Sequence, residues 1–142
     1  MRTLLIIKPD GVLRGLIGEI IHRFERYGIR IIGLKMVNVT REMAERLYFI
    51  HKGKPFYNEL IEYITSSPVV AAVLEIDSSS KDAISLVRKV IGVTNPLEAE
   101  MGTIRGDYAL SITKNIVHAS DSEESANYEI PIFFTEKELV KY

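Results

Sequence analysis

The chain has 142 residues, of which 46% are hydrophobic and 26% are charged, with a formal net charge of −1 and no cysteine. This composition is typical of one globular domain with a buried core, and the balanced charge excludes binding of nucleic acid or an anionic membrane through a global charge excess. Any phosphate site must therefore be a local gathering of cations. The absence of cysteine excludes disulfides, a thiolate nucleophile and cysteine-based zinc sites.

No segment of the sequence has the pattern of a targeting or membrane-spanning signal. The apolar run in residues 1–7 is too short for a signal peptide, and Lys8 follows it at once. A membrane span needs roughly 20 apolar residues, and no segment approaches that length. We therefore expect a single cytoplasmic domain covering residues 1–142, with no membrane partner and no required nucleic acid.

The first half of the chain is predicted to alternate between strands and helices. The helix over residues 16–27 would bury Ile20 and Phe24 and expose Glu19 and Arg23. In chain order, the expected elements are a buried strand at 3–7, a Lys-Pro-Asp-Gly turn at 8–11, the helix at 16–27 ended by Gly28, a strand at 29–39, a helix at 41–50 capped by Thr40, and a helix at 56–65.

The second half continues the alternation around one long loop that is rich in glycine. Such a loop, at residues 92–106, is typical of a functional segment. The other expected elements are a central strand at 68–76, a polar loop at 77–81, a helix at 81–91, a strand within 108–118, a helix from Ser122 that stops before Pro131, and a strand or coil at 132–142 with a capping-box turn at Thr135 and Glu138.

This order of elements matches a split βαβ unit that occurs twice. It predicts an α+β fold of the ferredoxin-like βαββαβ type, in which a four-stranded antiparallel sheet is covered by helices. The sequence contains no repeat of solenoid length, no low-complexity tract and no interdomain linker.

A short apolar run that ends in His118 is the first candidate for a functional site. Ser120 and Glu123 have the spacing of a capping box, which predicts a helix start just after the histidine. His118 would then lie at the carboxyl end of a strand beside a helix N-terminus, a position that attracts anions. Imidazole is nucleophilic near neutral pH and suits group transfer, but a histidine that merely plugs the strand end is the alternative.

Three cationic side chains could act with His118 on an anionic ligand. Lys8 ends the first strand, Arg88 lies late in a helix, and Arg105 lies between a threonine and a Gly-Asp turn. A guanidinium can fork around phosphate oxygens, and Gly106 would let the backbone approach a ligand closely. Read singly, Lys8 is a solvated lysine at a turn and Arg88 is a surface arginine.

The remaining candidates are open to two readings each. Asn115 would lie on the opposite strand face from His118, so a bulge or turn is needed to bring them together. Tyr48, Phe56 and Tyr57 could be core residues or ligand contacts. The sequence has no P-loop and no dinucleotide-binding fingerprint, and its three histidines lack the spacing of metal ligands.

Four runs of residues together resemble the nucleoside diphosphate kinase family. They are Lys8-Pro9-Asp10-Gly11-Val12, Thr94-Asn95-Pro96, Gly102-Thr103-Ile104-Arg105-Gly106-Asp107 and Asn115-Ile116-Val117-His118-Ala119-Ser120-Asp121-Ser122. The resemblance covers residues 3–142. It implies a ferredoxin-like fold, a homo-oligomer (hexamer or tetramer), and transfer of the γ-phosphate of a nucleoside triphosphate to a nucleoside diphosphate.

The resemblance also implies roles for individual residues. His118 matches the family's phosphorylated histidine, and Ser120 and Glu129 match the pair that orients it. Asp121 would lie near a Mg²⁺ ion that the nucleotide phosphates mainly hold. Phosphate- and sugar-binding residues of the family match Lys8, Tyr48, Arg88, Thr94, Arg105 and Asn115. The apolar slot for the base matches Phe56, Leu60 and Ile112. The chain departs from the family pattern at Val93, Met101 and Thr113.

These roles imply a ping-pong reaction in one site. His118 would attack the γ-phosphorus, become a phosphohistidine, and pass the phosphoryl group to a second nucleotide. The three cations, with Mg²⁺, would neutralise the charge that develops on the leaving oxygen. Because the slot offers apolar contact and no base-edge hydrogen bonds, we expect broad use of bases and sugars.

Two other classes of function compete with the enzyme. One is a ferredoxin-like ligand-binding or regulatory module without catalysis, which would need only the fold and a loop pocket. The other is a scaffold protein. A nucleophile among three cations favours the enzyme, because a binding module has no need of a nucleophile beside phosphate anchors.

Overall fold

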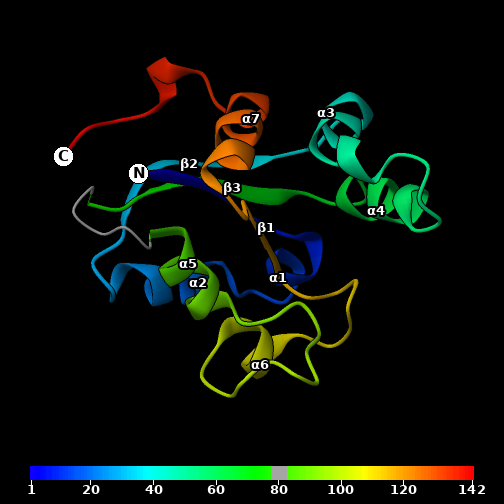
Figure 1. Cartoon of the computed structure of the whole chain (residues 1–142), viewed down its shortest axis with the longest axis horizontal. Helices are drawn as coiled ribbons and strands as arrows, with labels where there is room; N and C mark the ends of the chain where they lie inside the picture. The colour runs from blue at the N-terminus through cyan, green and yellow to red at the C-terminus, as the bar shows by residue number, and fades with distance from the viewer. Residues whose placement is uncertain (78–82) are drawn as a thin grey trace.

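The computed structural model describes residues 1–77 and 83–142. The polar loop predicted at 77–81 and the start of the helix predicted at 81–91 therefore lie largely outside the described residues. The described elements are β1 (Arg2–Ile7), α1 (Pro9–Leu13), α2 (Ile17–Glu25), β2 (Arg30–Val37), α3 (Arg41–Leu47), the 3₁₀ helix η1 (Phe49–His51), α4 (Tyr57–Ile64), β3 (Val69–Glu75), α5 (Ala83–Ile91), α6 (Ile104–Tyr108), β4 (Val117–Ala119), α7 (Glu123–Phe133) and the 3₁₀ helix η2 (Glu136–Glu138) (Figure 1).

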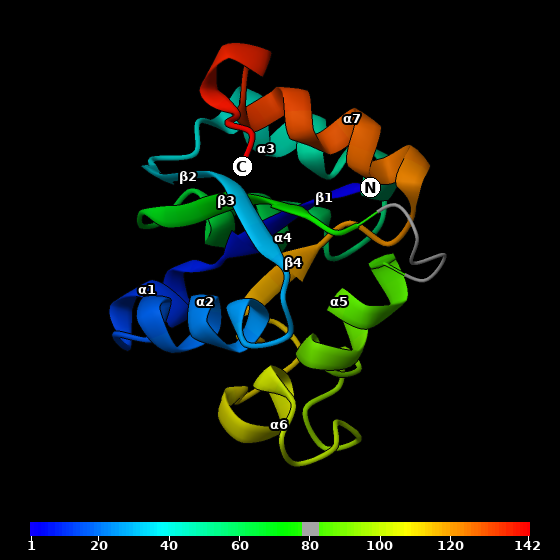
Figure 2. The ribbon, with the colours of Figure 1, turned by 90° about the vertical axis from the view of Figure 1, so that its left-hand side faces the viewer.

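The four strands form one antiparallel sheet in the order β2-β3-β1-β4. This is the ferredoxin-like arrangement that the sequence predicts. β3 is apolar on both faces and lies between β2 and β1, as expected for a central strand. Helices cover both faces of the sheet, with α3 and α7 on one side and α1, α2 and α5 on the other (Figures 1 and 2).

Alternate side chains of the strands enter two separate apolar cores. Leu4 and Ile6 of β1 pack under α3, α4 and α7, whereas Leu5 and Ile7 pack against α2 and α5. His118 of β4 pairs with Ile6, so its side chain lies on the same face as α3 and α7. The strand register therefore decides which helices can contact the histidine.

Two predicted turn or loop segments form short helices. Residues 8–11 were expected to be a turn, but Pro9 begins α1, where its fixed φ and its missing N–H are both tolerated. The loop expected at 92–106 ends in α6, because the Thr103 hydroxyl accepts a hydrogen bond from the Gly106 N–H and caps the helix. As a result, the strand expected within 108–118 is reduced to β4.

The start and the end of α7 also differ from the prediction. The capping box uses Ser122 and Ser125, and Ser120 is buried below it. The helix continues through Pro131 to Phe133 because the missing N–H falls in the last turn, where Ile132 and Phe133 are buried in the core. The capping box predicted at Thr135 and Glu138 is present. In the described part of the chain, no helix is long and apolar enough to cross a membrane.

Candidate active site

A cavity of about 700 Å³ opens beside β4, between α4 on one wall and the loop before β4 on the other. The side chains named from the sequence converge on it from distant parts of the chain. Those that line it are Lys8, Tyr48, Phe56, Leu60, Arg88, Thr94, Arg105, Ile112, Asn115, His118, Asp121 and Glu129. Ser120 is the exception, since it is buried and reaches the cavity only through Glu129.

The His118 ring is held at one nitrogen and open at the other. Its Nε2 lies 2.7 Å from Oε1 of Glu129 on α7. A carboxylate only accepts hydrogen bonds, so Nε2 carries the hydrogen and Nδ1 keeps its lone pair. The side chain is 22% exposed and faces the cavity. The ring is thus open to the cavity at Nδ1 and is not packed into the end of the strand.

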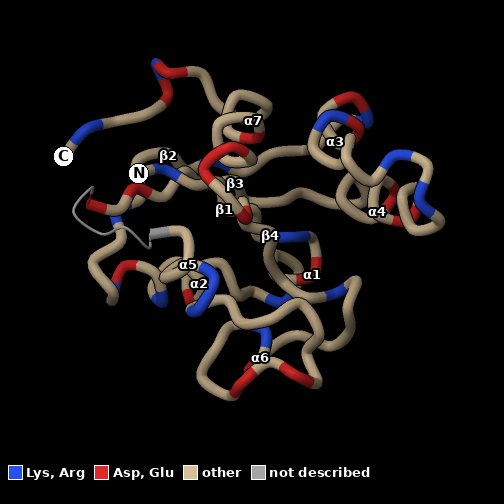
Figure 3. Tube along the Cα trace, in the orientation of Figure 1, with Lys and Arg blue, Asp and Glu red and all other residues tan. Residues whose placement is uncertain are grey.

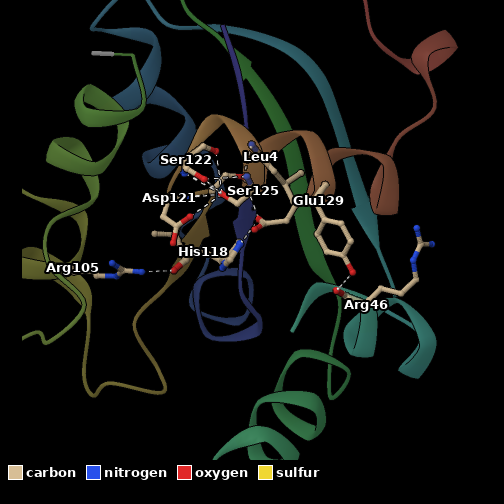
Figure 4. A network of polar contacts seen from close by, with 11 residues as sticks. Leu4, Arg46, Arg105, His118, Asp121, Ser122, Ser125 and Glu129 are labelled. Carbon is tan, nitrogen blue, oxygen red and sulfur yellow. Dashed lines mark hydrogen bonds and ion pairs between the residues drawn. The ribbon is translucent and has the colours of Figure 1, made fainter. Parts of the chain in front are cut away.

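A relay of hydrogen bonds fixes the carboxylate that holds His118 (Figure 4). The backbone N–H of Leu4 donates to the Ser120 hydroxyl at 3.3 Å, and that hydroxyl donates to Glu129 Oε1 at 3.1 Å. Leu4 belongs to the middle of the sheet and is completely buried. The orientation of the imidazole is therefore tied to the rigid core.

Lys8 is buried, so the solvated reading of this lysine is wrong. Its side chain is only 7% exposed, and its Nζ donates to Oδ1 of Asn115 at 3.0 Å. Burial and, to a smaller extent, the Arg105 charge lower the pKa of Lys8 from its ordinary value of 10.5 to about 8, although the Asp10 charge acts in the opposite direction. A buried ammonium with one neutral partner is well placed to bind an anion.

Arg105 is also buried, and it binds backbone of the chain itself. Its Nε, Nη1 and Nη2 donate to the carbonyls of Asn115, Gly92 and Val117, respectively. A guanidinium has five N–H donors, so two are not used in these three bonds. Burial lowers its pKa to about 10, and the Arg88 charge contributes in the same direction. The guanidinium thus connects the backbone at Gly92, Asn115 and Val117, and Arg105 also lines the cavity.

Asn115 shares the cavity with His118 because the chain turns between them. Ile116 has φ of 77°, and the Val117 N–H donates to the Asn115 carbonyl at 2.9 Å, which makes a γ-turn. On a regular strand, Asn115 and His118 would point to opposite faces. The turn at Ile116 removes this separation, so both side chains line the same cavity.

The glycine-rich loop is held by contacts that the sequence did not reveal. Asp107 accepts the Gly102 N–H at 2.8 Å and Nη1 of Arg23 at 2.7 Å, and these two contacts lower its pKa. Arg23 was expected to face solvent but is 8% exposed, and helical periodicity alone gives no signal of this long-range pair. A Cβ on Gly106 would collide with the Glu100 carbonyl. The missing side chain therefore allows the backbone at Glu100, and not a ligand, to approach closely.

The apolar end of the cavity has exposed aromatic and aliphatic side chains. Phe56 and Ile112 are exposed on opposite walls, and Leu60 is partly buried against the core. Exposed apolar side chains that face one another are typical of a ligand slot. The sequence did not single out His51, whose ring packs edge-on against Phe56 at 5.3 Å between centroids.

Tyr48 combines the two readings left open for it. It is 6% exposed in the core, yet it lines the cavity with its ring edge-on to His118 at 6.3 Å between centroids. Burial, and then the nearby Glu129 charge, raise the pKa of its hydroxyl. The hydroxyl therefore stays protonated and can act as a neutral donor.

Comparison with known proteins agrees with this geometry. A family model described as "Nucleoside diphosphate kinase" matches residues 1–139. The nucleoside diphosphate kinase of Sulfurisphaera tokodaii is 63% identical over 139 residues, which are 98% of this chain and 92% of the relative. That of Staphylothermus marinus is 57% identical over 141 residues, covering 99% and 97%.

Solved structures of similar sequence share the fold. The nucleoside diphosphate kinase of Aquifex aeolicus has a TM-score of 0.91 at 44% identity and covers 98% of both chains. A halophilic nucleoside diphosphate kinase from Halobacterium salinarum, solved in complex with CDP, has a TM-score of 0.93 at 42% identity, covering 100% of this chain and 92% of that one. The chain therefore belongs to the nucleoside diphosphate kinase family and is a phosphotransferase enzyme.

Proposed function

We propose that the chain transfers the γ-phosphate of a nucleoside triphosphate to a nucleoside diphosphate through a phosphohistidine at His118. The observation that carries the proposal is the free Nδ1 of His118 in a cavity that is also lined by Lys8, Arg88 and Arg105. Figure 3 shows that basic residues are otherwise scattered among acidic ones. The cations of the cavity are thus a local gathering, as a phosphate site in a nearly neutral protein requires.

In the first half-reaction, His118 Nδ1 attacks the γ-phosphorus in line with the bond to the β-phosphate oxygen. The N–P bond forms as the P–O bond breaks, and the diphosphate leaves with the electron pair. Lys8 and Arg105 neutralise the leaving oxygens, while Glu129 accepts Nε2–H and stabilises the charged ring. The second nucleoside diphosphate reverses these steps in the same cavity, which is a ping-pong scheme.

Kinases of this family typically need a divalent metal, and we propose Mg²⁺. Among the described residues, no three His, Cys, Asp or Glu side chains form a group that could hold a metal ion. Asp121 lines the cavity, with its Oδ1 accepting the Ser125 hydroxyl at 2.8 Å. The residues therefore fit an ion that arrives on the nucleotide phosphates, near Asp121. Such an ion would supply charge neutralisation.

The slot, the assembly and the location complete the proposal. Apolar contact from Phe56, Leu60 and Ile112 accepts any base, so purine and pyrimidine nucleotides with either sugar are substrates.

The most exposed large apolar side chains, Leu97 and Met101, lie in the glycine-rich loop and support a homo-oligomer. We expect the enzyme to act on nucleotides in the cytoplasm.

The test is incubation of the protein with γ-labelled ATP and Mg²⁺. We expect acid-labile, base-stable label on the wild type, its loss in His118→Ala, and its transfer to added nucleoside diphosphate. His22→Ala is the matched control, because His22 is an exposed histidine on α2. Wild-type protein that binds ATP but takes up no label would instead favour the binding module.

A further inference from the structure

Ile116 has a backbone conformation that β-branched residues rarely adopt. Its φ of 77° is the only positive φ of a non-glycine residue among the described residues. Such outliers persist only where the surrounding structure holds them, and they cluster at functional sites. Here the outlier lies between Asn115 and Val117, on the wall of the proposed active site.

A buried carboxylate holds this turn from the side of α1. Asp10 Oδ2 accepts the Ile116 N–H at 3.1 Å, and Asp10 Oδ1 accepts the Tyr63 hydroxyl at 2.6 Å. The Tyr63 oxygen in turn accepts the Asp10 N–H at 3.0 Å. Asp10 is 7% exposed, so its negative charge must be satisfied by these donors. Tyr63 thereby orients the carboxylate toward Ile116.

The same segment is held from other sides. The Lys8 N–H donates to the Ile116 carbonyl at 2.7 Å, and the Ile116 side chain is completely buried. A Cβ on Gly11 would lie 3.2 Å from Ile116 Cγ2, so α1 approaches the turn closely. Neither Asp10 nor Tyr63 lines the cavity. Their effect reaches the cavity through the turn, where Asn115 Oδ1 accepts from Lys8 Nζ at 3.0 Å.

We propose that Asp10 and Tyr63 are positioning residues for phosphoryl transfer, which fix the left-handed Ile116 and so hold Asn115 beside Lys8 in the cavity. This inference rests on the proposed function, because it concerns the same cavity. It adds two residues that contact neither the nucleotide nor His118. Their contribution is the placement of a neutral donor and a cation before the nucleotide arrives.

The experiment is a double-mutant cycle between Tyr63 and Asn115. kcat and KM for phosphoryl transfer from Mg-ATP to a nucleoside diphosphate are measured for the wild type, Tyr63→Phe, Asn115→Ala and the double variant. Tyr57→Phe is the matched control, since it removes the same group from the same helix without touching Asp10. Asp10→Asn is the second variant, should the first fail to fold.

We expect Tyr63→Phe to lower kcat about fivefold, as loss of one orienting hydrogen bond does. In the Asn115→Ala background the same change should lower it by less than about twofold, because Asn115 is the group through which Tyr63 acts. Equal losses in both backgrounds, or a Tyr63→Phe variant as active as Tyr57→Phe, would overturn the inference. An inactive, unlabelled wild type would instead overturn the proposed function.

Discussion

At the scale of single residues, burial gives this cavity its chemistry. Lys8 and Arg105 are withdrawn from water, and burial lowers the pKa of each toward the physiological range. The His118 ring, in contrast, is partly exposed to the cavity and contacts Glu129 through Nε2. The cavity thus combines two buried cations with one partly exposed imidazole.

Lys8 is predicted to set the alkaline limit of activity. Its pKa of about 8 lies below the ordinary value, so the charged form is present below pH 8 and is lost as pH rises through that value. In the free enzyme, kcat/KM for Mg-ATP should therefore fall with a midpoint near pH 8, while kcat should fall at higher pH because bound phosphates favour the ammonium. A pH–rate profile of the wild type against Lys8→Arg checks this. The prediction would be contradicted if kcat/KM fell at the same alkaline pH in the wild type and in Lys8→Arg.

At the scale of elements, α7 supplies the Glu129 carboxylate and follows β4 after a short turn. Its N-terminus is capped by Ser122 and Ser125, whose hydroxyls satisfy one another's backbone N–H groups. Tyr128 also donates from α7 to the Arg46 carbonyl of α3 at 2.7 Å (Figure 4). The helix that carries Glu129 is thus fixed at its N-terminus and against α3.

Ser122→Ala should lower the free energy of unfolding by about 1 kcal/mol, because it removes the acceptor for the Ser125 N–H. Denaturant unfolding followed by circular dichroism measures this change. The control is Ser85→Ala on the exposed face of α5, where alanine is a better helix former and no loss is expected. Equal stability of Ser122→Ala and the wild type would show that this cap contributes nothing.

The sequence predicts which segments form helices and strands better than it predicts the residues at which they begin and end. The apolar runs of β1 and β3 and the periodicity of α2 are strong local signals, and each lies where predicted. Pro131 predicts a helix stop, but α7 continues past it, because burial of Ile132 and Phe133 outweighs the missing N–H. Of the site, the motifs and the family resemblance named many of the residues that line the cavity, but not His51. The bonds of Asp10 to Tyr63 and Ile116, and of Arg23 to Asp107, could not be predicted, because these partners lie far apart in the chain.

At the scale of the whole molecule, the cavity joins segments from both halves of the chain. Its walls come from α4, α5, α7, β4 and the loops around α6. The sheet between them has an apolar core on each face. A nucleotide in the cavity would therefore contact elements on both sides of the sheet, and its binding energy would add to the stability of the complete fold.

Nucleotide binding should raise the melting temperature. At a Mg-ADP concentration of about 100 times its Kd, linkage contributes about 2.7 kcal/mol, which corresponds to roughly 5–10 °C for a domain of this size. Differential scanning fluorimetry with Mg²⁺ alone as the control measures the shift. His118→Ala should keep most of it, because the phosphate anchors remain. Absence of a shift in the wild type at saturating Mg-ADP would contradict the assignment of the cavity.

The hydrogen bond from the Leu4 amide to the Ser120 hydroxyl links a backbone proton in the buried sheet to the His118 side chain in the cavity. The NMR signal of this amide proton can therefore serve as a probe of His118. Under the proposed mechanism, phosphorylation of His118 would polarise the Glu129 carboxylate and then the Ser120 hydroxyl, and would change the chemical shift of the Leu4 amide proton. The Leu4 amide resonance would thus report whether His118 is phosphorylated, although Leu4 is completely buried and does not line the cavity.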